Sequence, residues 1–206
     1  MQKESLCRAL SSVSRKMADK CLYLVELDQR NGDGDLGISM KEGFKAAERY
    51  IRDTEERDLG RLMAGIAGVF NETAPSSLGT ILSIGMMGMA KTLKGKEKAQ
   101  TEEVATALLA GIRKIMERAH SKPGEKTILD ALYPAAEALK ENAEKRAEEA
   151  YAIAVEAARR GAESTKDMLP RHGRAAYYGE KSLGIVDGGA VAGLLILEGI
   201  YESVCR

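Results

Sequence analysis

The sequence carries no surplus charge of either sign, because 31 lysines and arginines balance 31 aspartates and glutamates. Chains that bind nucleic acid usually present a basic surface, so we predict no nucleic-acid partner. No apolar run reaches the roughly 18 residues of a membrane span, and we predict no membrane segment. The polar, charged start is unlike a secretory signal peptide. The cysteines are scattered without metal or disulfide spacing, which favours free thiols, mostly core filler, in a cytoplasmic protein.

Proline and aromatic residues are also scarce, whereas alanine, glutamate, lysine, leucine and methionine are plentiful. This composition favours helices over strands. Apolar residues recur at helical spacing, and we predict an all-α fold of about eight helices in a single domain over residues 1–206. Pro134 is expected to kink its helix, unless that helix begins later. The predicted helices cover approximately residues 6–27, 40–51, 62–69, 78–93, 101–116, 129–139, 143–162 and 190–204.

Four connections between these helices are rich in Gly, Ser, Thr, Asp or Pro. They cover residues 31–37, 73–80, 121–127 and 165–189. If consecutive helices run antiparallel, alternate connections share an end, so several of these loops would meet at one rim. Loops on a rigid scaffold commonly carry functional residues.

The first of these loops gathers Asp28, Asp33 and Asp35 within eight residues, with glycines around the last two. Magnesium typically takes one or two carboxylates together with phosphates and water. Three like charges without a cation would be costly. One alternative is an ordinary acidic turn, which Asn-Gly and Asp-Gly sequences also form. A calcium loop of the EF-hand type would need a glutamate at its twelfth position, where Ser39 or Phe44 stands, so that alternative fails.

The other loops contain hydroxyl groups and one arginine near predicted helix starts. Ser76 and Ser77 precede an apolar helix, and Thr127 precedes another. Free amides at a helix N-terminus form an anion site, although a simple cap explains each residue alone. Arg174 could clamp a phosphate, and its default role is a solvated charge. Asp187 precedes the last helix as a cap.

Several catalytic signatures are absent. The two histidines, His120 and His172, have no partner that suggests a triad or metal site, and we predict that both are surface residues. No nucleophile elbow, Walker loop or kinase glycine-rich loop occurs.

Four motifs follow one another along nearly the whole chain. They are GDGDLG at residues 32–37 with Asp28 five residues before its first aspartate, KTILDAL at 126–132 followed by Pro-Ala-Ala at 134–136, TKDM at 165–168 with GRAAYYGEKS at 173–182, and DGGA at 187–190. This ordered set resembles the DhaL family, the ADP-binding L subunit of dihydroxyacetone kinase. The family's motifs read GDGDxG, KTMLDAL-x-PAA, TKDM with GRASY and GERS, and DPGA.

The resemblance implies an eight-helix antiparallel barrel with an adenine nucleotide, ADP or ATP, at one end. Asp28, Asp33 and Asp35 would hold two Mg²⁺ ions on its phosphates, and with Arg174 they form the expected catalytic set. The other implied contacts are Ser76, Ser77 and Thr127 with phosphate oxygens, Leu78 and Ile128 near the adenine, and Asp187 with Gly188 closing over it.

The resemblance also implies a kinase that needs a partner. A separate K-type subunit would hold the small keto-sugar, a triose or tetrose, that accepts the phosphate. The donor would be exchanging ATP, or a phosphotransferase-system phosphoprotein that rephosphorylates bound ADP; a homodimer is compatible with either. The alternatives are a non-catalytic Mg-nucleotide-binding regulatory subunit, a divergent kinase for another small substrate, and a purely structural helical module.

The sequence departs from the family pattern in four places. Leu36 replaces a histidine, Glu125 replaces an aspartate, Gly188 replaces a proline, and the serine loop is one residue shorter than ASGPLYGT. The three aspartates are unchanged. We therefore expect nucleotide binding to survive these differences better than the substrate assignment.

Overall fold

Helices account for all regular secondary structure in the computed structural model, which describes residues 1–206. It contains nine α-helices, two 3₁₀ helices and no strand, so the all-α prediction is confirmed. The elements are α1 (Lys3–Asp19), α2 (Cys21–Asp28), α3 (Leu36–Asp53), α4 (Leu59–Thr73), α5 (Ser77–Leu93), α6 (Thr101–Ala119), α7 (Leu129–Glu141), α8 (Ala147–Ser164), η1 (Thr165–Asp167), η2 (Arg174–Ser182) and α9 (Gly188–Val204).

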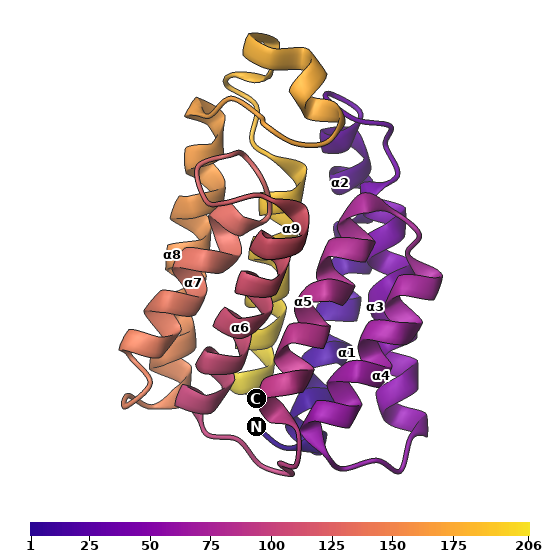
Figure 1. Cartoon of the computed structure of the whole chain (residues 1–206), viewed down its shortest axis with the longest axis vertical. Coiled ribbons are helices and arrows are strands. Elements are labelled where there is room, and N and C mark those ends of the chain that lie inside the picture. The colour runs from indigo at the N-terminus through magenta and orange to yellow at the C-terminus, as the bar shows by residue number, and fades with distance from the viewer.

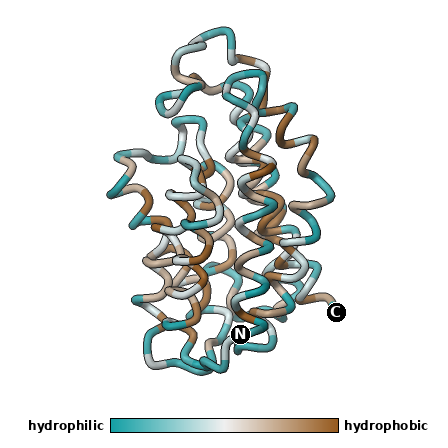
Figure 2. Tube along the Cα trace, turned by 90° about the vertical axis from the view of Figure 1, so that its right-hand side faces the viewer, coloured by the Kyte–Doolittle hydropathy of each residue, from teal (hydrophilic) through white to brown (hydrophobic).

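Eight of these helices form an antiparallel barrel. Consecutive helices from α3 to α9 pack side by side, and α1 closes the ring by packing against both α3 and α9. The helices run alternately up and down in Figure 1, so alternate connections lie at the same end. Figure 2 shows hydrophilic residues concentrated in the loops at both ends of the barrel. The predicted eight-helix barrel is confirmed.

The ninth helix comes from a break in the first predicted one. The backbone leaves the helical region at Lys20 (φ −100°, ψ 6°), which separates α1 from α2. The apolar spacing continues across this break, because Leu24 and Leu27 of α2 are also buried. A continuous helix over residues 6–27 was therefore the wrong prediction. Beyond the break, α2 packs on α3 and α9.

The barrel interior is apolar and not completely filled. A cavity of about 160 Å³ is lined by side chains from all eight helices of the ring, including Phe44, Ile66 and Ile112. Burial of such side chains is the main stabilising term of a helical barrel. The cavity is lined almost entirely by hydrophobic residues, so it offers no polar chemistry to a nucleotide.

Glycines allow α5 and α6 to approach closely. A methyl group added at Gly111 would lie 2.5 Å from the carbonyl oxygen of Gly85, which is far closer than van der Waals contact. Both glycines lie in the helical stretches that the apolar pattern predicted. The close approach of the two helices explains why glycine is found at these positions, although glycine destabilises a helix interior.

Pro134 lies inside α7, which begins at Leu129, so the alternative that this helix begins after the proline is wrong. A proline cannot donate to the carbonyl four residues earlier, here that of Asp130. That carbonyl packs directly against Gly161 of α8, where any side chain would collide with it. The helix therefore accommodates proline where its neighbour is a glycine.

The cysteines are all free, as predicted; Cys7 packs against the core, but none of the three is fully buried. Cys7 and Cys21 are half-buried, and Cys205 is exposed. No helix combines the length and the apolar character needed to cross a membrane.

Candidate functional site at the loop end of the barrel

Four connections meet at the upper end of the barrel in Figure 1. They link α2 to α3, α4 to α5, α6 to α7, and α8 to α9. These are the four polar loops that the sequence singled out. The antiparallel order of the ring brings them to one rim, because each is separated from the next by two helices.

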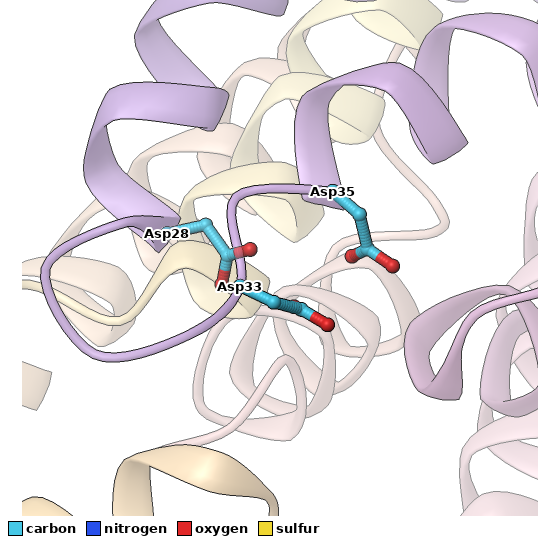
Figure 3. A group of neighbouring side chains, drawn as sticks. All are labelled: Asp28, Asp33 and Asp35. Carbon is cyan, nitrogen blue, oxygen red and sulfur yellow. The ribbon is translucent and has the colours of Figure 1, made fainter.

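The three aspartates form a cluster at this rim. One carboxylate oxygen from each of Asp28, Asp33 and Asp35 lies within 4.8 Å of the others. Figure 3 shows the three side chains on the loop that joins α2 to α3. Asp28 ends α2, and Asp35 precedes α3 without using its carboxylate as a helix cap. The carboxylate of Asp35 is therefore free to bind a ligand.

Hydrogen bonds within the loop hold this arrangement. The Oδ2 atom of Asp28 accepts from the amide of Gly34 at 2.8 Å and from that of Leu36 at 3.4 Å. Gly34 has φ +80°, a left-handed conformation that favours glycine. The loop thus curls back on Asp28, which leaves the second oxygen of that carboxylate for other contacts.

The electrostatics of the cluster favour a cation. Desolvation raises the pKa of Asp35, and the negative charges of Asp33 and Asp28 raise it further, while Arg174 opposes the shift. The guanidinium of Arg174 lies 2.7 Å from Asp33 Oδ2, although its side chain is 67% exposed. Three converging carboxylates are the oxygen donors that hard divalent cations such as Mg²⁺ prefer, so the residues fit that ion.

Arg174 belongs to a capping segment, defined here as residues 165–187, which contains η1 and η2 and forms the orange top of Figure 1. The segment also contacts the α6–α7 loop. The Arg171 amide donates to the Glu125 carbonyl at 3.3 Å, and His172 Nε2 lies 2.7 Å from Glu125 Oε2. His172 is 34% exposed, and the sequence did not reveal that it would pair with Glu125. Its contact with Glu125 is the first cause that lowers the pKa of that carboxyl.

The α6–α7 loop is organised by Asp130, a buried residue in the first turn of α7. Its two carboxylate oxygens accept from the amides of Gly124 at 2.5 Å and Thr127 at 2.7 Å. The Thr127 hydroxyl accepts from the Leu129 amide at 3.2 Å, so Thr127 forms a turn just before the helix, whose N-cap residue is Ile128. The neighbouring Lys126 is also buried.

Lys126 and Asp130 were not singled out from the sequence, although both lie in the KTILDAL motif. A signal was present, because charged residues inside an apolar stretch are almost never buried without partners. Asp130 in particular interrupts an otherwise apolar helix start. Their partners lie in backbone groups of loops, which no spacing rule reveals.

Asp187 caps α9 as predicted, since its Oδ2 atom accepts from the Ala190 amide at 2.7 Å. Its own amide donates to the Thr165 hydroxyl at 2.9 Å. The residue keeps some exposed surface, but its carboxyl group is enclosed, and desolvation raises its pKa to about 7. The charge of Asp130 adds to that rise, and Lys126 opposes it.

Gly188 lies against the aspartate loop. A methyl group added to it would lie 2.7 Å from a terminal methyl of Leu36. These are two of the positions where the sequence departs from the DhaL pattern. The Leu36 side chain therefore occupies space that a side chain at position 188 would need.

The remaining predicted contact residues lie at the same end but apart from the aspartates. Ser76 caps α5 by accepting from the Gly79 amide at 3.1 Å, and the next residue, Ser77, is exposed. Leu78 is half-buried against the core, and Ile128 is 3% exposed. Among the predicted residues, the structure therefore brings Arg174 directly to the aspartates, whereas the hydrogen bonds of Ser76 and Thr127 are local to their own loops.

Comparisons with known proteins agree with this architecture. Residues 31–202 match the DAK2 domain. The chain is 30% identical to L-erythrulose 1-kinase of Mycolicibacterium smegmatis, over 98% of this chain and 36% of that protein. It is 28% identical to the ADP-binding subunit DhaL of PEP-dependent dihydroxyacetone kinase 1 of Listeria innocua, over 98% of this chain and 96% of that protein.

A solved structure has the same fold. The dihydroxyacetone kinase from C. freundii, crystallised with AMP-PNP and Mg²⁺, superposes with a TM-score of 0.76 at 25% identity, over 96% of this chain and 33% of that chain. The chain thus spans about a third of the longer kinases that it matches. It corresponds in length to the separate subunit of Listeria innocua.

Proposed function

The chain belongs to the DAK2 domain family and to its DhaL branch, and on that basis we propose that it is the nucleotide-binding L subunit of a dihydroxyacetone-type kinase. It would carry a magnesium–adenine nucleotide, ADP or ATP, and take part in phosphate transfer to an alcohol group of a small keto-sugar. The observation that carries this proposal is the cluster of Asp28, Asp33 and Asp35 at the loop end of the barrel. The kinase names of the relatives favour this reading over a purely regulatory subunit.

The aspartates would hold the metal. Carboxylate oxygens of Asp28, Asp33 and Asp35 lie within 4.8 Å of one another. Together with phosphate oxygens and water, these three carboxylates would suffice to bind two Mg²⁺ ions. Magnesium supplies charge neutralisation on the nucleotide phosphates when bound. Asp28 has the additional task of shaping the loop, because it already accepts two backbone amides.

The remaining residues would position the nucleotide. Arg174 approaches from the opposite loop and would neutralise phosphate charge, since guanidinium groups bind phosphates well. Ser77 and the amides at the start of α5 offer donors to phosphate oxygens, as the N-termini of helices commonly do. The other proposed contacts are Ser76 and Thr127 with phosphate oxygens, Leu78 and Ile128 near the adenine, and Asp187 with Gly188 closing over it.

The acceptor would be held by another chain. The rim contains no residue that we assign as a general base, and phosphoryl transfer depends mainly on positioning and charge neutralisation. A separate K-type subunit that binds the triose or tetrose would complete the site. Exchanging ATP or a phosphotransferase-system phosphoprotein would recharge the nucleotide. We further propose that residues 1–206 act as one domain, which can form a homodimer, and the free thiols support a cytoplasmic location.

Titration calorimetry would test the proposal. ADP and ATP are titrated with and without Mg²⁺ into the wild type, the Asp33→Asn variant and a matched Asp53→Asn control at an exposed position at the end of α3. We expect magnesium-dependent binding that Asp33→Asn weakens by at least tenfold and Asp53→Asn leaves unchanged. Absence of binding to the wild type, after any retained nucleotide has been removed, would overturn the proposal.

A further inference from the structure

A buried ammonium group joins two loops of the site. Lys126, in the α6–α7 loop, is only 3% exposed. Its Nζ atom donates to the carbonyl oxygens of Ser182 and Ile185, both at 2.8 Å. Both acceptors lie in the capping segment, more than fifty residues further along the chain. We propose that Lys126 is a positioning residue that holds the capping segment in place over the aspartate cluster.

The backbone of Lys126 supports a specific role for its side chain. Lys126 has φ +60°, a left-handed conformation that residues other than glycine seldom adopt. A glycine would be the less strained choice at this position. The chain instead has a lysine there, and in this left-handed conformation its side chain is buried in the interior. The next residue, Thr127, can then donate its amide to Asp130 just before α7 begins at Leu129.

The surroundings of the ammonium make its loss costly. Its two hydrogen-bond acceptors are neutral carbonyls. Burial lowers the pKa of Lys126, and the negative charges of Asp187 and Asp167 oppose that shift. Ser182 is fully buried. The Ser182 carbonyl also accepts from the Ile185 amide at 3.2 Å, so removing the ammonium would take the lysine donor from both carbonyls and leave that of Ile185, in a part-buried location, without its partner. The capping segment is therefore held at this point by Lys126.

The contact of Lys126 with Ser182 and Ile185 lies between two residues that are proposed to face the nucleotide, Arg174 and Asp187. Ser182 is the last residue of η2, and Arg174 is the first. Ser182 donates its hydroxyl to the Gly179 carbonyl at 2.7 Å, and the backbone kinks at Gly179 (φ 51°) between this bond and Arg174. Ile185 lies two residues before Asp187, which caps α9. Lys126 thus fixes the end of the unit that presents Arg174 to Asp33, and also the approach to Asp187.

The inference rests on the proposed function for its consequence, which is weaker nucleotide binding when Lys126 is replaced. Two variants remove the ammonium in different ways. Lys126→Met keeps most of the side-chain volume, whereas Lys126→Gly suits the left-handed backbone and protects against failure to fold. Lys122→Met is the control, because Lys122 is an exposed lysine in the same loop.

Hydrogen–deuterium exchange is measured first, without nucleotide. In both Lys126 variants we expect faster exchange in residues 174–187, with the barrel helices unchanged, and no effect in Lys122→Met. Calorimetry with ADP and Mg²⁺ follows, and we expect at least tenfold weaker binding by both Lys126 variants.

The two measurements separate this inference from the proposed function. A wild type that binds no ADP would refute the proposed function, while exchange in the unliganded protein would still decide the role of Lys126. Unchanged exchange in residues 174–187 of both variants would overturn the inference, even if the wild type binds ADP. Faster exchange throughout the barrel would also overturn it, because Lys126 would then be a general stabilising residue.

Discussion

Replacing Asp35 by asparagine should have opposite effects on stability and on nucleotide binding. The substitution removes one of three clustered negative charges while keeping the shape of the side chain. The metal-free protein should therefore become more stable, because the desolvation of a charge and the repulsion from Asp33 and Asp28, which raise the pKa of Asp35, disappear. Magnesium-dependent ADP binding should weaken at the same time, because one proposed metal ligand is lost.

The magnitude follows from Coulomb's law and the exposure of the site. Two unit charges about 4 to 5 Å apart interact by roughly 1 kcal/mol in water and by several times more in a partly desolvated site. Asp33 and Asp35 are exposed, so the value should lie near the lower limit, and Arg174 offsets part of it. We expect a gain of about 0.5–1 kcal/mol, which for a chain of this size raises Tm by roughly 1–4 °C.

Thermal unfolding in EDTA at low salt would measure the first effect and calorimetry the second. Asp53→Asn, at an exposed position paired with Arg49, is the control and should change neither quantity substantially. A lower Tm for Asp35→Asn in EDTA would refute the electrostatic reasoning. Unchanged affinity for ADP with Mg²⁺ would refute the assignment of Asp35 as a metal ligand.

Three further predictions concern the enclosed carboxyl and the close contacts. The pKa of Asp187 is raised to about 7 in the folded protein, so the native state keeps this proton at pH values where the unfolded state has lost it. The free energy of unfolding should therefore fall as the pH rises from about 4 to about 7. Asp187→Asn keeps the helix cap and should make that fall smaller in denaturant titrations. Gly111→Ala should destabilise the protein by about 1–3 kcal/mol, because the new methyl group would collide with the α5 backbone. Gly68→Ala, on the open face of α4, should stabilise the protein by up to about 1 kcal/mol. Equal effects of the two substitutions in chemical denaturation would contradict the packing argument. Gly188→Ala should lower the free energy of unfolding by about 1 kcal/mol, because the new methyl group contacts Leu36. In a double-mutant cycle, Gly188→Ala should be less destabilising when Leu36 is also replaced by alanine. Strictly additive effects would show that the two positions are not coupled.

The fold was largely predictable because its pattern is local. Apolar residues at helical spacing marked every helix of the barrel, whereas the antiparallel barrel itself was implied by the resemblance to the DhaL family. The break at Lys20 was missed because the apolar stripe continues through it, so spacing alone could not separate α1 from α2. The course of α7 through Pro134 depends on Gly161 of another helix, which the local sequence does not reveal.

The aspartate cluster was predictable for a similar reason. Asp28, Asp33 and Asp35 lie within eight residues, so their proximity is almost a property of the chain itself. The contact between Arg174 and Asp33 was different, because it joins two loops through the closure of the barrel. The sequence suggested a phosphate role for Arg174, but not its partner.

The sequence alone determined the helical class, the four polar loops and the three carboxylates, because each depends on residues that are close along the chain. Only the tertiary structure decided how the loops are held together. Lys126 bonds to Ser182 and Ile185, and His172 pairs with Glu125, across about fifty residues of intervening chain. Such contacts require the ends of α6, α8 and α9 to meet, and this meeting follows from the packing of the whole barrel rather than from any one segment.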